Sequence, residues 1–338
     1  MYQINQNKED RNLWTKMTKI PRENHLTLNK LNINYFMSKK HISLNPPIVN
    51  ACGILSYLDV FERLEKMNAN FGAWIPKSIG PFEKQGNPNP TIYHNGSVLL
   101  NSFALPTHSI QSWIKEFESA DLKKPVIGSV WGTKIEDYRD VIKKIDKYVS
   151  AWEINVSCPN KEAGEKSLME SMTEKIKEII MPLREVTQKP IIAKLSPNED
   201  YVAIAKSIVD YVDYIACGNT LGPGLAVDIY SRKPILAGFA GGMSGEAIKP
   251  KAMKMVNDVY KIASKEDVKL IAYGGISKWE DILEYAIAGA SIFGIGTSLL
   301  HKDAGQVAKF VNNMWKDVLK YIEKENISFD EIVGCLDG

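Results

Sequence analysis

The sequence has few cysteines and no regular spacing among them. Cys52, Cys158, Cys217 and Cys335 are the four cysteines in 338 residues, and no two of them form a Cys-x-x-Cys pair. This pattern argues against a disulfide framework and against a structural zinc site. The five histidines also lack metal-ligand spacing, so we expect no metal site. Any important cysteine is expected to act alone as a thiol.

An excess of charge of one sign is also missing. Lys and Arg total 42 against 40 Asp and Glu, which leaves a formal net charge of +2 and argues against a dedicated nucleic-acid binder. No apolar run approaches the roughly 20 residues needed to cross a bilayer. The polar first 30 residues lack the apolar core of a secretory signal. We therefore expect a cytoplasmic protein that binds neither nucleic acid nor membrane.

The chain divides into a polar start and a long patterned region. Residues 1–30 are rich in charge with little apolar periodicity, which predicts an N-terminal extension outside the core of a domain at 31–338. From about Pro46, short apolar runs alternate with amphipathic stretches, as in repeated βα units. Eight such runs are present, at 47–51, 73–78, 126–130, 152–156, 191–195, 214–217, 270–273 and 292–295.

Eight βα repeats predict an α/β protein with a single (β/α)8 TIM barrel, with an open doubly wound sheet as the alternative. Helical patterns fill most gaps between the apolar runs, at 58–67, 169–186, 247–263, 279–288 and 304–321, and another begins near Ser109. The segment 80–100, rich in Pro, Gly and Asn, predicts a long excursion after strand 2 that covers an active site.

The predicted strands end in polar residues. Lys77-Ser78 ends the second strand, Lys194 lies in the fifth and Asn219-Thr220 follows the sixth. Barrel enzymes build their sites at these strand ends, so the side chains are expected to share one mouth. A lysine inside a parallel strand usually has a partner anion, which predicts a negatively charged ligand.

Three glycine clusters occur late in the chain. They are Gly241-Gly242-Met243-Ser244-Gly245, Gly274-Gly275 after the seventh strand, and Gly296-Thr297 after the eighth. Any one of them is most simply a turn. Three together, at the corner where barrels commonly bind phosphate, predict a phosphate site.

Cys158 differs from the other cysteines in its sequence context. A free cysteine is most often a small buried hydrophobe, and we interpret Cys52, Cys217 and Cys335 in this way. Cys158 instead lies on the loop after the fourth strand, between Asn155 and Asn160, and is followed by a proline. We expect its thiol to face the cavity, and we interpret the polar segment 161–167 as a lid.

These motifs resemble those of a known family, the class 1 dihydroorotate dehydrogenases, which are flavin-dependent barrels of pyrimidine biosynthesis. The resemblance covers about residues 31–300, and the order and spacing of its motifs are specific. The motifs are Lys77-Ser78, Gly86-Asn87-Pro88-Asn89-Pro90, Asn101-Ser102-Phe103-Ala104-Leu105-Pro106, Asn155-Val156-Ser157-Cys158-Pro159-Asn160, Asn219-Thr220, Gly241 to Pro250, Gly274-Gly275-Ile276 and Gly289-Ala290-Ser291 running into Gly296-Thr297.

The resemblance implies FMN across the barrel mouth and a catalytic cysteine. Cys158 would remove the C5 proton of dihydroorotate while hydride passes from C6 to flavin N5. The implied FMN contacts are Ala51, Gly53, Lys77, Ser78, Asn155 and Lys194 at the ring and ribityl chain, and Gly245, Gly274, Gly275, Gly296 and Thr297 at the phosphate. The implied substrate contacts are Lys77, Asn101, Phe103, Ala104, Leu105, Asn155, Asn160, Asn219 and Thr220.

Two features depart from the family pattern. Ala104 stands where a glycine is usual, and Thr107-His108-Ser109 replaces the Asn and Gly that commonly follow Leu-Pro. These changes predict a reshaped substrate loop. An FMN barrel acting on another reduced pyrimidine, as in the dihydropyrimidine dehydrogenases, is therefore an alternative, although that family typically has His where Asn160 stands.

Other functional classes are less well supported. A dihydrouridine synthase would need a basic RNA-binding domain, which the sequence lacks. A non-catalytic barrel serving as a partner subunit would not need Cys158, Lys77 and the asparagines.

The family passes electrons to fumarate or, through a separate iron–sulfur flavoprotein subunit, to NAD, and the stretch 219–250 resembles the second group. We expect a homodimer that associates with such a subunit.

Overall fold

The computed structural model describes residues 39–96, 98–156 and 169–337, and Lys39–Gly338 form one compact unit. Its centre is a curled sheet of seven parallel strands in the order β1-β13-β12-β7-β6-β5-β4. The strands are β1 (Ile48–Asn50), β4 (Ile127–Val130), β5 (Ala151–Asn155), β6 (Ile191–Leu195), β7 (Tyr214–Cys217), β12 (Lys269–Tyr273) and β13 (Ile292–Ile295).

An eighth parallel segment, residues 73–79, lies between the two edges of this sheet. Single bridges pair Ala73 with Val49 of β1 and Trp74 with Val126 beside β4. The segment is not a regular strand because Pro76 has no N–H to donate and Ile75 N donates to the Asn50 side chain at 2.9 Å. Eight segments at the predicted places confirm the single (β/α)8 barrel.

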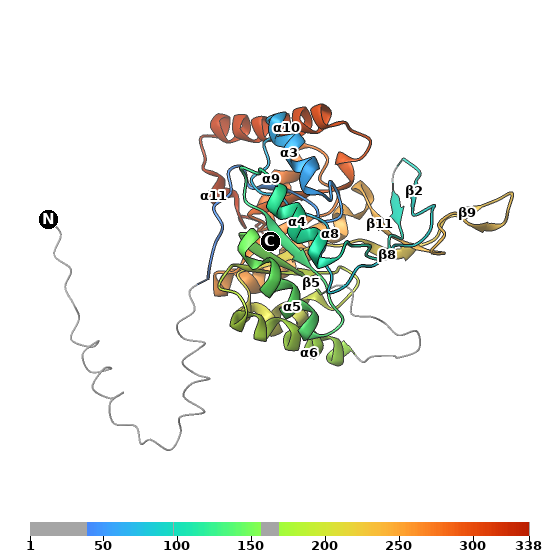
Figure 1. Ribbon diagram of the computed structural model, residues 1–338. Coiled ribbons are helices and arrows are strands. Elements are labelled where there is room, and N and C mark those ends of the chain that lie inside the picture. The colour runs from blue at the N-terminus through green and yellow to red at the C-terminus, as the bar shows by residue number, and fades with distance from the viewer. Residues whose placement is uncertain (1–38, 97, 157–168, 338) are drawn as a thin grey trace, which may run out of the picture. The chain divides into compact units, whose positions relative to one another are not determined.

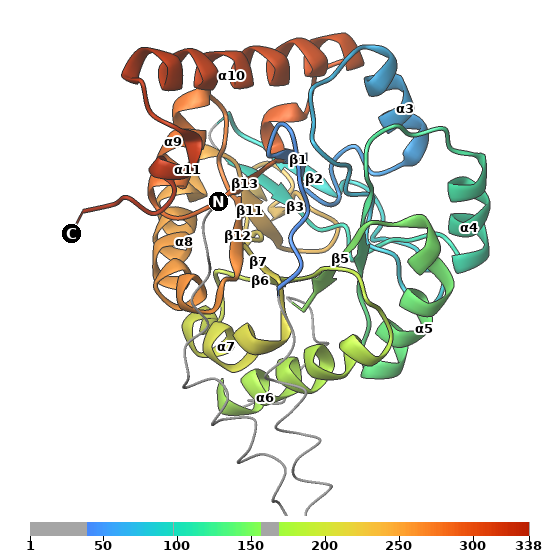
Figure 2. The ribbon, with the colours of Figure 1, turned by 90° about the vertical axis from the view of Figure 1, so that its left-hand side faces the viewer.

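Helices surround the strands in a ring, which Figure 2 shows from one end of the barrel. The predicted helical patterns are confirmed, and Ser109 caps its helix by accepting a hydrogen bond from Ser112 N. The helices are α3 (Leu58–Lys66), α4 (Ile110–Ser119), α5 (Ile135–Ile145), α6 (Met169–Ile180), α7 (Tyr201–Ile208), α8 (Lys249–Ala263), α9 (Trp279–Ile287), α10 (Ala304–Glu325) and α11 (Phe329–Ile332). Short 3-10 turns are η2 (Asp146–Tyr148), η3 (Met181–Glu185), η4 (Val209–Tyr211), η5 (Glu246–Ile248), η6 (Ser264–Glu266) and η7 (Thr297–Leu299).

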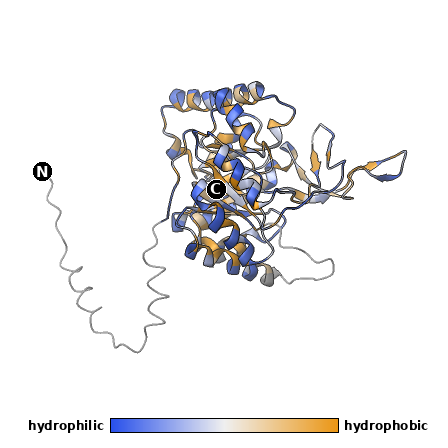
Figure 3. Cartoon of the chain, viewed as in Figure 1, coloured by the Kyte–Doolittle hydropathy of each residue, from blue (hydrophilic) through white to orange (hydrophobic). Residues whose placement is uncertain are grey.

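The strands bury side chains on both faces. Outward-facing residues pack against the helices, while Val49, Ile127, Ile192 and Ile271 are among those that fill the barrel interior. Figure 3 shows hydrophobic residues concentrated on the strands and hydrophilic ones on the outer faces of the helices. This is the pattern expected of strands covered by helices. No helix in the described ranges is long and apolar enough to span a membrane.

A second sheet, which we call the mouth sheet, extends from the barrel (Figure 1). It is antiparallel, with the order β2-β3-β11-β8. The predicted excursion thus contains two strands, because residues 92–101 pair with each other and β3 pairs with β11, about 140 residues later in the chain. The strands are β2 (Ile92–His94), β3 (Leu99–Asn101), β8 (Leu221–Gly224) and β11 (Gly241–Ser244), and a hairpin of β9 (Val227–Asp228) and β10 (Lys233–Pro234) follows β8.

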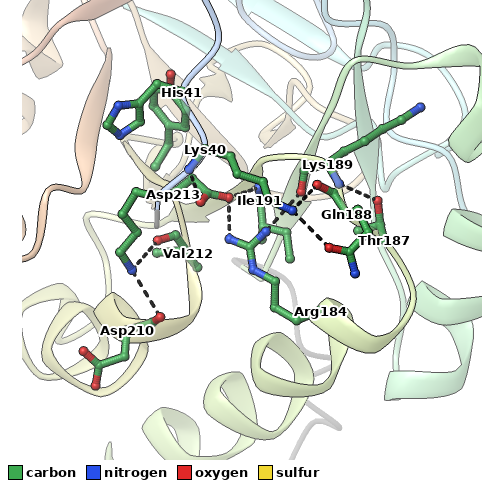
Figure 4. Close-up of polar contacts among 12 residues, drawn as sticks. Lys40, His41, Arg184, Thr187, Gln188, Lys189, Ile191, Asp210, Val212 and Asp213 are labelled. Atoms are coloured by element: carbon green, nitrogen blue, oxygen red, sulfur yellow. Dashed lines mark hydrogen bonds and ion pairs between the residues drawn. The ribbon is translucent and has the colours of Figure 1, made fainter. Parts of the chain in front are cut away.

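Polar contacts fix the first described residues to the base of the barrel (Figure 4). Asp213, which is buried, accepts hydrogen bonds from Lys40 N at 2.8 Å and Ile191 N at 2.7 Å, and it pairs with Arg184. Lys39 Nζ donates to three carbonyls at the end of η4, those of Val209, Asp210 and Val212. These bonds satisfy helix-end carbonyls and a buried carboxylate together.

Candidate active site

A cavity of about 440 Å³, which we call the mouth cavity, lies where the barrel strands end. Its walls come from the ends of β1, β5, β6, β7, β12 and β13 and from the segment 73–79, and β3 adds residues from the mouth sheet. Side chains and turns that are far apart in the sequence meet here because parallel barrel strands all end at one face.

The mouth cavity brings together the predicted site residues that the structure describes. They are Ala51, Gly53, Lys77, Ser78, Asn101, Phe103, Ala104, Leu105, Asn155, Lys194, Asn219, Thr220, Gly245, Gly274, Gly275, Gly296 and Thr297. Cys158, Asn160 and the predicted lid at 161–167 lie outside the described residues, so the structure says nothing of their positions.

Two lysines, Lys77 and Lys194, line the mouth cavity. Burial lowers the pKa of Lys77, while the nearby Cys52 acts in the opposite direction. The Lys77 ammonium lies 5.6 Å from the centre of the Phe103 ring. Lys194 is 7% exposed and ion-paired with Glu153 at 3.4 Å. A bound anion would offset the cost of holding the Lys77 charge in this partly dry position.

Glycines form one corner of the mouth cavity. Gly245, Gly274 and Gly275 have φ angles of 105°, 128° and 69°, which only glycine adopts readily. A Cβ at Gly275 would lie 2.8 Å from Lys249 Cβ and 3.1 Å from the Gly245 carbonyl oxygen, so the backbone turns pack closely. The preceding residues Gly241–Ser244 form strand β11, and within this cluster only Ser244 and Gly245 line the cavity.

The loop after β3 also lines the cavity and is strained. Ala104 and Leu105 have φ angles of 60° and 56°, in the left-handed region that costs a non-glycine residue about 1–2 kcal/mol. Ala104 therefore keeps the conformation that a glycine would adopt with less strain. Nearby, Ser102 lines the cavity, and its buried Oγ has no hydrogen-bond partner among the described residues.

The other three cysteines differ in burial and location. Cys217 is fully buried, which raises the pKa of its thiol and confirms the interpretation as a core residue. Cys335 is exposed, so that interpretation is wrong there because the chain end lies at the surface. It is also wrong for Cys52, which lines the mouth cavity and contacts Ser78 Oγ at 3.1 Å.

Sequence reasoning missed further cavity residues. Tyr273 is the last residue of β12, and its position two residues after the inward-facing Ile271 could have indicated an inward side chain. Ser196 and Asn198 follow β6, and Asn198 Nδ2 donates to the Thr220 carbonyl at 2.8 Å. Ser196 and Asn198 could have been predicted by the rule used for Asn219, that polar residues after a barrel strand line the site.

Comparison with known proteins gives consistent matches along most of the chain. The family profile described as dihydroorotate dehydrogenase matches residues 37–318. A dihydroorotate dehydrogenase B (NAD(+)), catalytic subunit, from Pyrococcus furiosus is 33% identical over 300 residues, which cover 87% of this chain and 95% of that protein. A protein of the same name from Malacoplasma penetrans is 37% identical over 284 residues, covering 80% of this chain and 87% of its own length.

A solved structure is similar in fold. It is described as the crystal structure of DHODH in complex with ferulenol from Eimeria tenella, and its TM-score is 0.69 at 19% identity. The match covers 94% of this chain and 96% of that one. At this identity the similarity supports the barrel fold alone.

Proposed function

Because the chain belongs to the dihydroorotate dehydrogenase family, it oxidises dihydroorotate to orotate in pyrimidine biosynthesis, and we propose that the mouth cavity holds the substrate together with FMN. The observation that carries this proposal is the convergence of strand-end residues from Ala51 to Thr297 on one cavity. We further propose that residues 31–338 are the FMN-binding domain and residues 1–30 an N-terminal extension.

The family is flavin-dependent, and the residues present fit FMN. A Cβ at Gly53 would meet no atom within 4 Å, so this glycine leaves open space in the cavity wall where a flat ring can lie. We assign the phosphate to Gly245, Gly274, Gly275, Gly296 and Thr297 and the ring and ribityl chain to Ala51, Gly53, Lys77, Ser78, Asn155 and Lys194. When bound, FMN supplies the acceptor for the hydride that leaves C6 of dihydroorotate.

The protein's own groups bind the substrate and move a proton. We assign the substrate carboxylate and ring amides to Lys77, Asn101, Phe103, Ala104, Leu105, Asn155, Asn160, Asn219 and Thr220. Asparagine amides both donate and accept hydrogen bonds, which suits a planar ring of carbonyl and N–H groups. Cys158, in its thiolate form, is proposed as the base that takes the C5 proton.

Partner chains belong to the proposal as well. The relatives' names describe them as catalytic subunits of an NAD(+) enzyme. This chain has no cysteine cluster for an iron–sulfur centre and no dinucleotide-binding fingerprint. We therefore propose a homodimer that passes its electrons to NAD through a separate iron–sulfur flavoprotein subunit, in the cytoplasm.

The first test is an absorbance spectrum of the purified protein, followed by anaerobic addition of dihydroorotate. We expect a yellow protein that bleaches. Cys158→Ser should keep FMN but slow flavin reduction by about 10²-fold or more near neutral pH, since general-base catalysis contributes at least that much. Cys335→Ser, at an exposed site, is the control. Unchanged reduction in the Cys158 variant would remove this residue from the mechanism.

A further inference from the structure

A buried layer of polar side chains lies directly beneath the mouth cavity. Glu153, in the middle of β5, is fully buried. Its Oε2 accepts a hydrogen bond from Tyr273 OH at 2.8 Å, and its Oε1 accepts from Ser129 Oγ at 3.2 Å and from Lys194 Nζ at 3.4 Å. A carboxylate this deep in a barrel carries a large desolvation cost unless such partners surround it.

Strand alternation puts all four side chains in the barrel interior. Each lies two residues after an inward-facing apolar residue, because Ile127, Ala151, Ile192 and Ile271 belong to the interior core. The interior therefore changes from apolar to polar just below the cavity. Ser129, Glu153, Lys194 and Tyr273 together are called the glutamate layer here.

Part of the glutamate layer reaches the cavity itself. Lys194 and Tyr273 line the cavity, and the Lys194 ammonium lies 4.5 Å from the centre of the Tyr273 ring. Burial, followed by the Glu153 charge, raises the pKa of Tyr273 well above its usual value, so the phenol stays protonated and donates to Glu153.

The fold makes specific room for the tyrosine ring. A Cβ at Gly294 of β13 would lie 1.9 Å from Tyr273 Cε1, and a Cβ at Gly218 would lie 2.3 Å from the Tyr273 carbonyl oxygen. Any larger residue at Gly294 would displace the ring. The contact between Tyr273 and Glu153 is therefore built into the neighbouring strands.

We propose that Glu153 and Tyr273 act through Lys194, by setting how much of its positive charge is felt at the flavin ring, and thereby set the flavin's midpoint potential. The inference rests on the proposed function, which assigns Lys194 to the flavin ring. A cation near the ring stabilises the negative charge of the reduced flavin, and the Glu153 charge offsets part of that effect. The hydrogen bond from Tyr273 in turn delocalises part of the negative charge on Glu153.

The two residues should shift the potential in opposite directions. Glu153→Gln removes the negative charge, so we expect the equilibrium for flavin reduction to become at least tenfold more favourable, which is about +30 mV for a two-electron couple. Tyr273→Phe removes the hydrogen bond and leaves more negative charge on Glu153, so we expect about threefold less favourable reduction. Both potentials are measured on the FMN-loaded protein by redox titration against a dye, which does not depend on turnover.

Tyr214→Phe is the matched control. Tyr214 is also a buried tyrosine of the barrel interior, but its OH accepts from Ile42 N at the opposite end. It should lower stability as much as Tyr273→Phe does and leave the potential unchanged. If wild type binds FMN and bleaches with dihydroorotate but both variants keep its potential, the role of Glu153 and Tyr273 in setting the potential is wrong and the proposed function stands. A wild-type protein without flavin would overturn both.

Discussion

At the scale of single residues, Lys77 gives the clearest indication that the ligand is an anion. Its ammonium is held in a partly dry cavity that lowers its pKa, so a bound anion would stabilise its charged form. Lys77→Met keeps most of the side-chain volume but removes the charge. We expect orotate to bind about 10- to 100-fold more weakly, the range for losing a charge-assisted hydrogen bond. The affinity can be followed by isothermal titration calorimetry with orotate.

A lysine outside the mouth cavity, Lys84, provides the comparison for this measurement. Lys84 lies over the Trp131 ring at 5.2 Å and is not among the residues that line the mouth cavity. Lys84→Met should bind orotate as wild type does. Equal affinities in the Lys77 and Lys84 variants would show that Lys77 does not contact the substrate.

Individual site residues could be predicted where residue type and strand end coincided. Lys194 and Asn155 were predictable because a charged or amide side chain inside a parallel strand needs a polar site. Cys52 was not, because cysteine is an ordinary core residue and only the fold shows that this one lies at the polar end of the barrel. For Tyr273 the alternation along β12 indicates an inward side chain, but only the fold shows that it reaches the cavity. The unusual Ala104 was noticed in the sequence, but its strained φ angle is visible only in the structure.

At the scale of elements, Asp281 connects two helices beside the glycine corner of the mouth cavity. It lies in the first turn of α9, is 1% exposed, and pairs with Lys249 at the start of α8. Burial alone would raise the pKa of Asp281. Hydrogen bonds from Lys249 and from the backbone N–H groups of Ser277 and Lys278 outweigh burial and lower it. Lys249 also pairs with Glu284 at 2.6 Å.

This lowered pKa predicts a stability that depends on pH. The contribution of Asp281 is complete above the pKa of an unfolded aspartate, near 4, and is lost as pH falls through the lower pKa of the folded state. Asp281→Asn should lower the free energy of unfolding by about 1–3 kcal/mol at pH 7 and by progressively less toward pH 3. Urea unfolding at several pH values measures both.

Asp303→Asn is the control for helix capping. Asp303 caps α10 through Gln306 N at 2.8 Å, and asparagine caps a helix nearly as well as aspartate. This variant should lose only a few tenths of a kcal/mol. An Asp281→Asn deficit that is as large at pH 3 as at pH 7 would contradict the charge-based explanation.

Elements of the barrel were predictable, and those of the mouth sheet were not. The barrel strands are apolar runs separated by amphipathic helices, so local periodicity suffices to locate them. Strands β2, β3, β8 and β11 have three or four residues each, and the pairing of β3 with β11 that joins the sheet crosses about 140 residues of chain. No local pattern reports such pairing.

At the scale of the whole molecule, the fold class followed from counting repeats, but the surfaces that contact partners did not. A hairpin that follows β8 exposes apolar side chains, and we call it the apolar hairpin. Ile229 is 76% exposed and Tyr230 89% exposed, and Leu225, Val227 and Phe239 are also exposed nearby. Scattered exposed apolar residues are ordinary, but a cluster on one projection is typical of an interface.

We expect the proposed homodimer to cover the apolar hairpin. The net charge of +2 gives two copies little repulsion, and the hairpin continues from the mouth sheet, so a second copy would also support the cavity wall. Light scattering of the purified chain should give twice 37.9 kDa. The double variant Ile229→Ser with Tyr230→Ser should shift the mass toward the monomer at micromolar concentration, whereas Leu319→Ser, at an exposed apolar residue of α10, should not. A monomeric wild type would refute the homodimer, and a double variant that stays dimeric would place the interface elsewhere.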